Sequence, residues 1–254
     1  MTHPLLHVRA LGATVAIDVT DPRLRPLALQ AWSACATSPV DGCPVVQAPT
    51  VLPGASSDDV AVALQTLTQL VTREAIGARA GQLMMFHAGA LCDQTSGATI
   101  AMVAPGGTGK TTLVRTLGHG RGYISDETVA VADDLSIEPY CKPLSIRRPD
   151  TGLPKDEVNP ADLGLTVPRV QPWLAGIVLL RRDRAEGAPT VVEPVDVLDA
   201  LVLLAPETSS LARVERPLHR LAGLVQAVGG LLRVRYHDAV EVEPVVRDIL
   251  GRSR

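Results

Sequence analysis

The sequence predicts an α/β fold, because short apolar runs of strand length alternate with longer amphipathic segments along most of the chain. Hydrophobic residues make up 46% of the 254 residues, so the chain can bury a large core and is not expected to be disordered. The clearest single signal lies at residues 100–113, where an apolar run is followed by a Gly-rich turn and the start of a helix.

Composition and charge exclude two classes of partner. The net charge is −3 and aromatic residues make up 2% of the chain, so a basic, base-stacking surface for nucleic acid is not expected. The first residues do not resemble a secretory signal, and no stretch reaches the ~18 uncharged apolar residues of a membrane span. We therefore expect a cytoplasmic protein without membrane contact. The sequence leaves the oligomeric state open, with a homo-oligomer among the alternatives.

The four cysteines do not indicate a metal or redox site. Cys35, Cys43, Cys92 and Cys141 are scattered without a CxxC spacing. Free cysteine usually behaves as a small buried hydrophobic residue, so we expect four reduced thiols.

Residues 1–80 are expected to form a small α/β lobe that recognises a substrate or partner. Asp21-Pro22 is typical of a helix start, and Ser57-Asp58 is typical of a second one. The predicted elements are a hairpin at 5–10 and 13–19, a helix from 21 to about 36, a strand at 45–48 and a helix from 57 to about 78.

Residues 81–254 are expected to form a second, larger part with a mixed sheet. Its predicted strands are 83–93, 98–103, 122–125, 128–132, 144–147, 175–181, 190–193 and 231–235, and its predicted helices are 110–117, 195–204, 217–228 and 243–250. The Pro-rich stretch 149–172 is longer than an ordinary connection, which favours a functional loop.

The turn in this second part has the pattern of a phosphate-binding loop. Glycines let the backbone curl so that successive N–H groups and the helix start offer partial positive charge to a phosphate. The Lys110 ammonium is then expected to reach the β- and γ-phosphates, and the Thr111 hydroxyl to bind Mg²⁺. The predicted nucleotide-binding residues are Pro105, Gly106, Gly107, Thr108, Gly109, Lys110, Thr111 and Thr112. The first position of the motif is Ala104 rather than glycine.

An acidic pair follows the loop closely and favours a kinase over a switch or transporter ATPase. Asp126 comes after a single predicted helix and one strand, so we expect that helix to return to a neighbouring strand whose end places the carboxylate beside the phosphates. Phosphoryl transfer needs a group that accepts the proton of the attacking hydroxyl, and Asp126 is the candidate for it. A carboxylate that holds Mg²⁺ through water, or a solvated strand end, are the alternatives.

These motifs together resemble a known family. The segments HAGAL from His87, APGGTGKTTLVRTLG from Ala104, GYISDETVAV from Gly122 and KPL from Lys142 are similar to the catalytic core of the HPr kinase/phosphorylase family, which shares a fold with phosphoenolpyruvate carboxykinase. The resemblance covers residues 83–147, and more loosely 173–205. It implies a short relative without the usual N-terminal domain, because the first 80 residues are not similar to that domain.

The resemblance assigns roles to several side chains. It implies that His87 lies near the reacting phosphate, that Asp126 acts on the hydroxyl nucleophile and that Glu127 is the second acid, with a metal or supporting role. A satisfied core histidine and an exposed acid are the alternatives for His87 and Glu127. Lys142 and Arg147 flank the next predicted strand, where a cation could neutralise the transferring phosphoryl group; salt-bridged surface residues are the alternative.

The sequence thus predicts an ATP- and Mg²⁺-dependent phosphotransferase whose acceptor is a hydroxyl group of a peptide, protein or small molecule. The missing N-terminal domain makes HPr itself a poor acceptor. A nucleotide-binding sensor without chemistry and a weak NTPase remain as alternatives.

Overall fold

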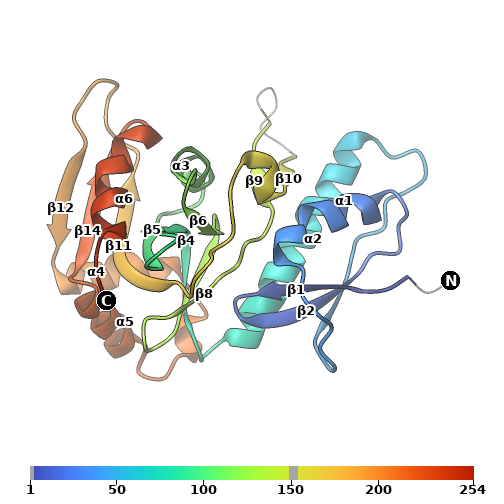
Figure 1. Ribbon diagram of the computed structural model, residues 1–254, viewed down its shortest axis with the longest axis horizontal. Helices are drawn as coiled ribbons and strands as arrows, with labels where there is room; N and C mark the ends of the chain where they lie inside the picture. Colours follow the sequence, from blue (N-terminus) through green and yellow to red (C-terminus); the bar gives the residue numbers. More distant parts are fainter. Residues whose placement is uncertain (1–2, 149–153) are drawn as a thin grey trace. The chain divides into compact units, whose positions relative to one another are not determined.

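The computed structural model describes residues 3–148 and 154–254 and divides the chain into two compact units (Figure 1). Unit 1 comprises Met1–Arg79 and Tyr140–Gly164, and unit 2 comprises Ala80–Pro139 and Leu165–Arg254. The sequence predicts a single boundary near residue 80, whereas the described residues of 140–164 belong to the same unit as the N-terminal residues. Of the loop expected at 149–172, residues 149–153 lie outside the described residues.

Unit 1 is a small α/β unit. Its strands β1 (Leu6–Ala10) and β2 (Ala13–Asp18) form the predicted antiparallel hairpin, and β3 (Val45–Gln47) pairs with β2 in parallel. The returning segment adds the hairpin of β9 (Leu144–Ile146) and β10 (Asp156–Val158).

The long helix α2 (Ser57–Arg79) packs against β2, β3 and β10. Leu67, Val71 and Ala75 are fully buried at a spacing of four residues, so they form an apolar stripe along one face of the helix. The predicted helix start at residue 57 is confirmed, but Ser56 caps it: the Ser56 N–H donates to the Asp59 carboxylate and the Asp59 N–H donates to the Ser56 hydroxyl, as in a capping box.

The first helix is shorter than predicted. α1 spans Leu24–Ala31, and a 3₁₀ turn at Ser33–Cys35 follows it. The Asp21 carboxylate accepts hydrogen bonds from the backbone N–H groups of Arg23 and Leu24, so it caps the helix start as expected. The end was predicted too late, because the Trp32 backbone leaves the helical conformation.

Unit 2 contains a mixed nine-stranded sheet with helices on both faces, so the α/β prediction is confirmed. The strand order is β12-β14-β11-β5-β4-β7-β8, and β6 and β13 also pair with β4. The strands are β4 (Met84–Cys92), β5 (Ala98–Val103), β6 (Gly122–Ser125), β7 (Thr128–Val131), β8 (Ile137–Glu138), β11 (Trp173–Arg181), β12 (Val191–Val195), β13 (Thr208–Ser209) and β14 (Leu231–Arg235). β5, β11 and β14 are parallel neighbours, whereas β4 is antiparallel to β5.

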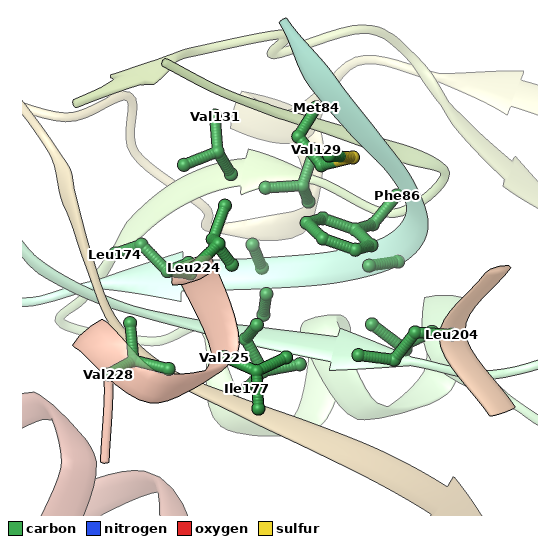
Figure 2. Close-up of a cluster of buried hydrophobic side chains, with 14 of the residues drawn as sticks. Met84, Phe86, Val129, Val131, Leu174, Ile177, Leu204, Leu224, Val225 and Val228 are labelled. Atoms are coloured by element: carbon green, nitrogen blue, oxygen red, sulfur yellow. The ribbon is translucent and has the colours of Figure 1, made fainter. Parts of the chain in front are cut away.

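The two faces of this sheet bury different helices. The helices are α3 (Lys110–Leu117), α4 (Val197–Leu204), α5 (Pro217–Ala227) and α6 (Glu243–Leu250). Alternate residues of β4, such as Met84 and Phe86, form one buried cluster with Ile177 of β11, Leu204 of α4 and Val225 of α5 (Figure 2). The strand residues next to these in sequence point to the opposite face of the sheet, toward α3 and α6. For example, a Cβ atom on Gly176 would meet the side chain of Ile249 in α6 at 2.8 Å.

Two sequence expectations about strand placement were wrong. β6 does not lie next to β5: it pairs with β4, which separates it from the strand before the loop. The strand predicted at 144–147 belongs to unit 1 and pairs with β10, not with the sheet of unit 2. Both errors concern pairing partners, which depend on contacts between distant segments rather than on local pattern.

Candidate functional site

The Gly-rich turn lies between β5 and α3, at the edge of the unit 2 sheet where β5 ends. Gly107 and Gly109 have φ values of 84° and 103°, a left-handed conformation that glycine adopts without strain. Gly109 is the residue before the first helical position of α3. Residues 105–107 are exposed and Ala104 is buried, so the chain leaves the core and returns to it within six residues.

The Lys110 side chain folds back over this turn. Its Nζ donates hydrogen bonds to the backbone oxygens of Ala104 at 2.5 Å and Pro105 at 3.1 Å. The side chain is only 6% exposed, so a positive charge is fixed at the base of the turn. Anions are stabilised at such a place by the charge and by the helix dipole together.

Thr111 and Asp126 meet beside the turn. The Thr111 hydroxyl donates to Asp126 Oδ2 at 2.8 Å, and the Tyr123 hydroxyl donates to Oδ1 at 3.3 Å. Asp126 is 4% exposed, and its carboxylate therefore depends on these donors for stabilisation. The predicted proximity of the acid to the loop is thus present, although β6 reaches it from the far side of β4.

A serine fixes the sharp turn that carries Asp126. Ser125 Oγ accepts hydrogen bonds from the backbone N–H groups of Glu127 at 3.2 Å and Thr128 at 3.1 Å. Such a side-chain turn replaces backbone pairing between β6 and β7 and leaves the two acidic side chains at its tip. Asp126 is buried, whereas Glu127 is half-buried.

The backbone of His87 and the next residue, Ala88, contacts both the Gly-rich turn and the acidic pair. The His87 carbonyl oxygen accepts from the N–H of Ala104 at 3.4 Å, and the next amide, that of Ala88, donates to the carbonyl oxygen of Glu127 at 3.0 Å. β4 therefore binds both functional segments at consecutive residues. His87 is half-buried, and it lies opposite Thr128 in the ladder of β4 and β7.

The charges around His87 act on its pKa in both directions. Burial and the nearby Lys110 ammonium hold the pKa below its usual value, while Glu127, Glu207 and Asp126 act to raise it. The burial contribution is the largest, so the neutral ring is favoured. A neutral imidazole can both donate and accept a hydrogen bond, which suits a residue close to a reacting phosphate.

A pocket of about 230 Å³ opens on the other side of the turn. Thr108, Gly109 and the α3 residues Thr112 and Thr116 line one wall. Leu113 of α3 also lines the pocket, and the other wall consists of Arg182, Tyr236, Asp238, Ala239 and Val240. The Tyr236 hydroxyl donates to the carbonyl oxygen of Thr108 at 3.2 Å and so joins this wall to the turn.

Lys142 and Arg147 belong to unit 1, so their predicted contact with phosphate stays a prediction. Lys142 is 1% exposed, and its Nζ donates to the Pro143 carbonyl oxygen at 2.9 Å. Lys142 is therefore not an exposed residue of a surface salt bridge, which was the alternative to a contact with phosphate. Arg147 follows β9 and is exposed.

The donor groups beside the turn fit a magnesium ion that arrives with a nucleotide. Mg²⁺ prefers oxygen ligands and is usually held by one or two carboxylates together with substrate phosphates and water. The Thr111 hydroxyl and the Asp126 carboxylate supply such oxygens 2.8 Å apart. Across residues 3–148 and 154–254, no group of three or more His, Cys, Asp or Glu side chains forms a metal site by itself.

Sequence reasoning missed Tyr123, Glu207 and Tyr236. Tyr123 precedes Asp126 by three residues on a strand, and no pattern indicated that its hydroxyl would reach the carboxylate. Glu207 comes just before β13, which pairs with β4 next to His87. Tyr236 is 128 residues from its partner Thr108, so only the parallel pairing of β11 with β14 brings it close.

Comparison with known proteins adds no assignment. No protein-family model matches the chain, and no curated protein is significantly similar to it. Within the part of the chain that the structure describes, no helix is both long and apolar enough to cross a membrane. The described cysteines are all free, and Cys35, Cys92 and Cys141 are buried as expected.

Proposed function

We propose that this protein transfers a phosphoryl group from a nucleoside triphosphate, with Mg·ATP as the expected donor, to a hydroxyl group of a peptide, protein or small molecule. The observation that carries the proposal is the 2.8 Å contact between Thr111 Oγ1 and Asp126 Oδ2 at the start of the helix that follows the Gly-rich turn. It brings together a phosphate-binding pattern and a candidate base that are 15 residues apart in the chain.

The side chains supply what phosphoryl transfer requires. Lys110 provides a fixed positive charge for the phosphates, and the backbone N–H groups at the start of α3 add partial positive charge. The bond between the γ-phosphorus and the bridging oxygen breaks, a bond from phosphorus to the acceptor oxygen forms, and Asp126 accepts the hydroxyl proton. Bound Mg²⁺ would neutralise phosphate charge, and the Thr111 hydroxyl and the second acid, Glu127, are the side chains that would hold it.

The proposal includes a core of the HPr kinase type. The motifs from His87, Ala104 and Gly122 support this relationship, and a mixed sheet with a strand, turn and helix in the required order is compatible with it. A unit 1 that is unlike the usual N-terminal domain of that family supports an acceptor other than HPr. Unit 1 is then the candidate for acceptor recognition.

The substitution Asp126→Asn tests the proposed base. We expect phosphoryl transfer to fall by roughly 10²–10⁴-fold, because the amide cannot accept the proton. Binding of Mg·ATP is expected to survive, since the turn and Lys110 are unchanged. Calorimetry measures binding, and mass spectrometry of serine peptides and small alcohols incubated with ATP measures transfer.

Asp199→Asn is the matched control, because Asp199 is an exposed carboxylate in the first turn of α4 within the same unit. It should leave both binding and transfer unchanged. Nucleotide binding without transfer in the wild type would favour a sensor. Hydrolysis without transfer to any acceptor would favour an NTPase. No heat with Mg·ATP or Mg·GTP would refute the phosphate-binding assignment itself.

A further inference from the structure

Thr111 and Thr112 point in different directions from the first turn of α3. Thr111 donates to Asp126, while Thr112 lines the pocket with Thr108 and Gly109. Neighbouring residues of a helix project about 100° apart, as 3.6 residues per turn require. The Gly-rich turn therefore lies between the acidic side of the site and the pocket.

This arrangement gives a bound polyphosphate a direction. If its reacting end lies near Asp126, its other end emerges at Thr112 and the pocket. We propose that the pocket holds the base of the phosphoryl donor and that it accepts adenine and guanine with similar affinity. This inference rests on the proposed function and extends it to the choice of donor.

The wall opposite α3 is fixed to the turn. Tyr236 is 1% exposed, its backbone N–H donates to the Arg181 carbonyl oxygen at 3.0 Å, and its hydroxyl donates to Thr108. Burial raises the pKa of Tyr236 to about 12, so the hydroxyl keeps its proton at neutral pH. The Arg182 Nε donates to the His237 carbonyl oxygen at 2.9 Å, which orients the guanidinium group.

The size and lining of the pocket suit a flat base. Its volume of about 230 Å³ is below the roughly 300–1,000 Å³ of pockets that enclose drug-sized ligands. Leu113, Ala239 and Val240 supply apolar contacts, and Val240 is 61% exposed at the mouth. A guanidinium such as that of Arg182 can stack on an aromatic ring of either purine.

The polar side chains that line the pocket are poorly suited to distinguish the edges of the bases, because the buried Tyr236 hydroxyl already donates to Thr108 and most of the others are exposed. Arg182 and Asp238 are 52% and 62% exposed, and Thr112 and Thr116 are also exposed. Strong discrimination arises when a mismatched ligand leaves a buried polar group without a partner, and exposed groups turn to water instead. A hydroxyl can in addition donate or accept, so it tolerates both purines.

The test compares three ligands that share a phosphate chain: Mg·ATP, Mg·GTP and Mg·tripolyphosphate, which has no base. We expect the wild-type dissociation constants for ATP and GTP to agree within about thirtyfold, the range of apolar contacts rather than of edge recognition. Thr116→Trp fills the pocket from α3. It should weaken both nucleotides by at least about tenfold, through loss of base contacts, and leave tripolyphosphate unchanged.

His119→Trp is the control, because His119 is exposed just beyond α3 and does not line the pocket. Val240→Trp fills the pocket from the other wall and replaces Thr116→Trp if that variant does not fold. Unchanged nucleotide affinity in a folded pocket variant would overturn the placement of the base. A preference of more than about thirtyfold for either purine would overturn the proposal that the pocket accepts adenine and guanine with similar affinity. Absence of all binding, tripolyphosphate included, would instead refute the proposed function.

Discussion

The ionisation of His87 follows from the groups that surround it. Burial and Lys110 lower its pKa, and three carboxylates act against them. We predict that the ring is neutral at pH 7 and titrates below 6.5, the ordinary value. Lys110→Met removes one lowering influence, so it should raise the His87 pKa, while Glu207→Gln should lower it further. NMR titration of the imidazole measures both shifts.

The same pKa has a consequence for stability. The folded protein binds the His87 proton less tightly than the unfolded chain, so the stabilisation is complete above pH 6.5 and is lost as the pH falls through the folded-state value. The control for Lys110→Met is Arg115→Met, which removes a positive charge from an exposed position of α3. An imidazole that still carries its proton at pH 7 would contradict the burial argument.

Individual residues also show which parts of the candidate site could be predicted from the sequence. Gly109, Lys110 and Thr111 were predictable because the turn is a local pattern whose backbone and side-chain chemistry are set by neighbouring residues. The proximity of Asp126 was predictable from its place after a single helix and one strand, but the path of β6 past β4 was not. Tyr236 carries no local signal, because its role comes from a contact 128 residues away.

The approach of α3 to β4 depends on a glycine in the strand. A Cβ atom on Gly89 would lie 2.9 Å from Val114 Cγ2 and 3.6 Å from Lys110 Cβ, so a side chain there would displace the first turns of α3. We predict that Gly89→Val lowers the free energy of unfolding by about 1–3 kcal/mol, as overpacking usually does. It should also weaken Mg·ATP binding, because Lys110 moves with the helix. Thermal unfolding and calorimetry measure the two effects.

Gly223 is the matched control for this substitution. It lies on the exposed side of α5, and an added Cβ atom would meet nothing within 4 Å. Gly223→Ala should leave nucleotide binding unchanged and raise stability by roughly 0.5–1 kcal/mol, because alanine loses less backbone entropy in a helix. Equal effects of the two substitutions would contradict the packing argument for Gly89.

Most helices and strands of unit 2 were predictable because their signals are local. Apolar periodicity located α3, α5 and α6, and α4 begins at Val197 because the Asp196 carboxylate caps it. The short strands β8 and β13 of unit 2, like β10 of unit 1, have two or three residues each, too few for a periodic pattern. They form because a longer strand or hairpin partner offers hydrogen bonds, which sequence alone does not reveal.

The division of the chain was predictable only in part, because unit 1 is completed by a segment that returns from far along the sequence. The Tyr140 and Thr72 hydroxyls lie 2.8 Å apart, and the Thr68 hydroxyl donates to Glu157 at 2.9 Å. These pairs are 68 and 89 residues apart. Such buried polar contacts fix the positions of Tyr140 and Glu157 on α2, but local hydropathy does not reveal them.

The returning segment predicts how fragments behave. A fragment of residues 80–254 keeps 140–164 but lacks α2, so the hydrogen bonds that Thr72 and Thr68 form with Tyr140 and Glu157 would be lost. We predict that it unfolds at a lower temperature than the same fragment in which a Gly/Ser linker replaces residues 140–164. Thermal unfolding and the dispersion of amide NMR signals measure the difference. If the simple fragment were equally stable, residues 140–164 would not depend on unit 1 for their structure, and the division of the chain would lie near residue 80 after all.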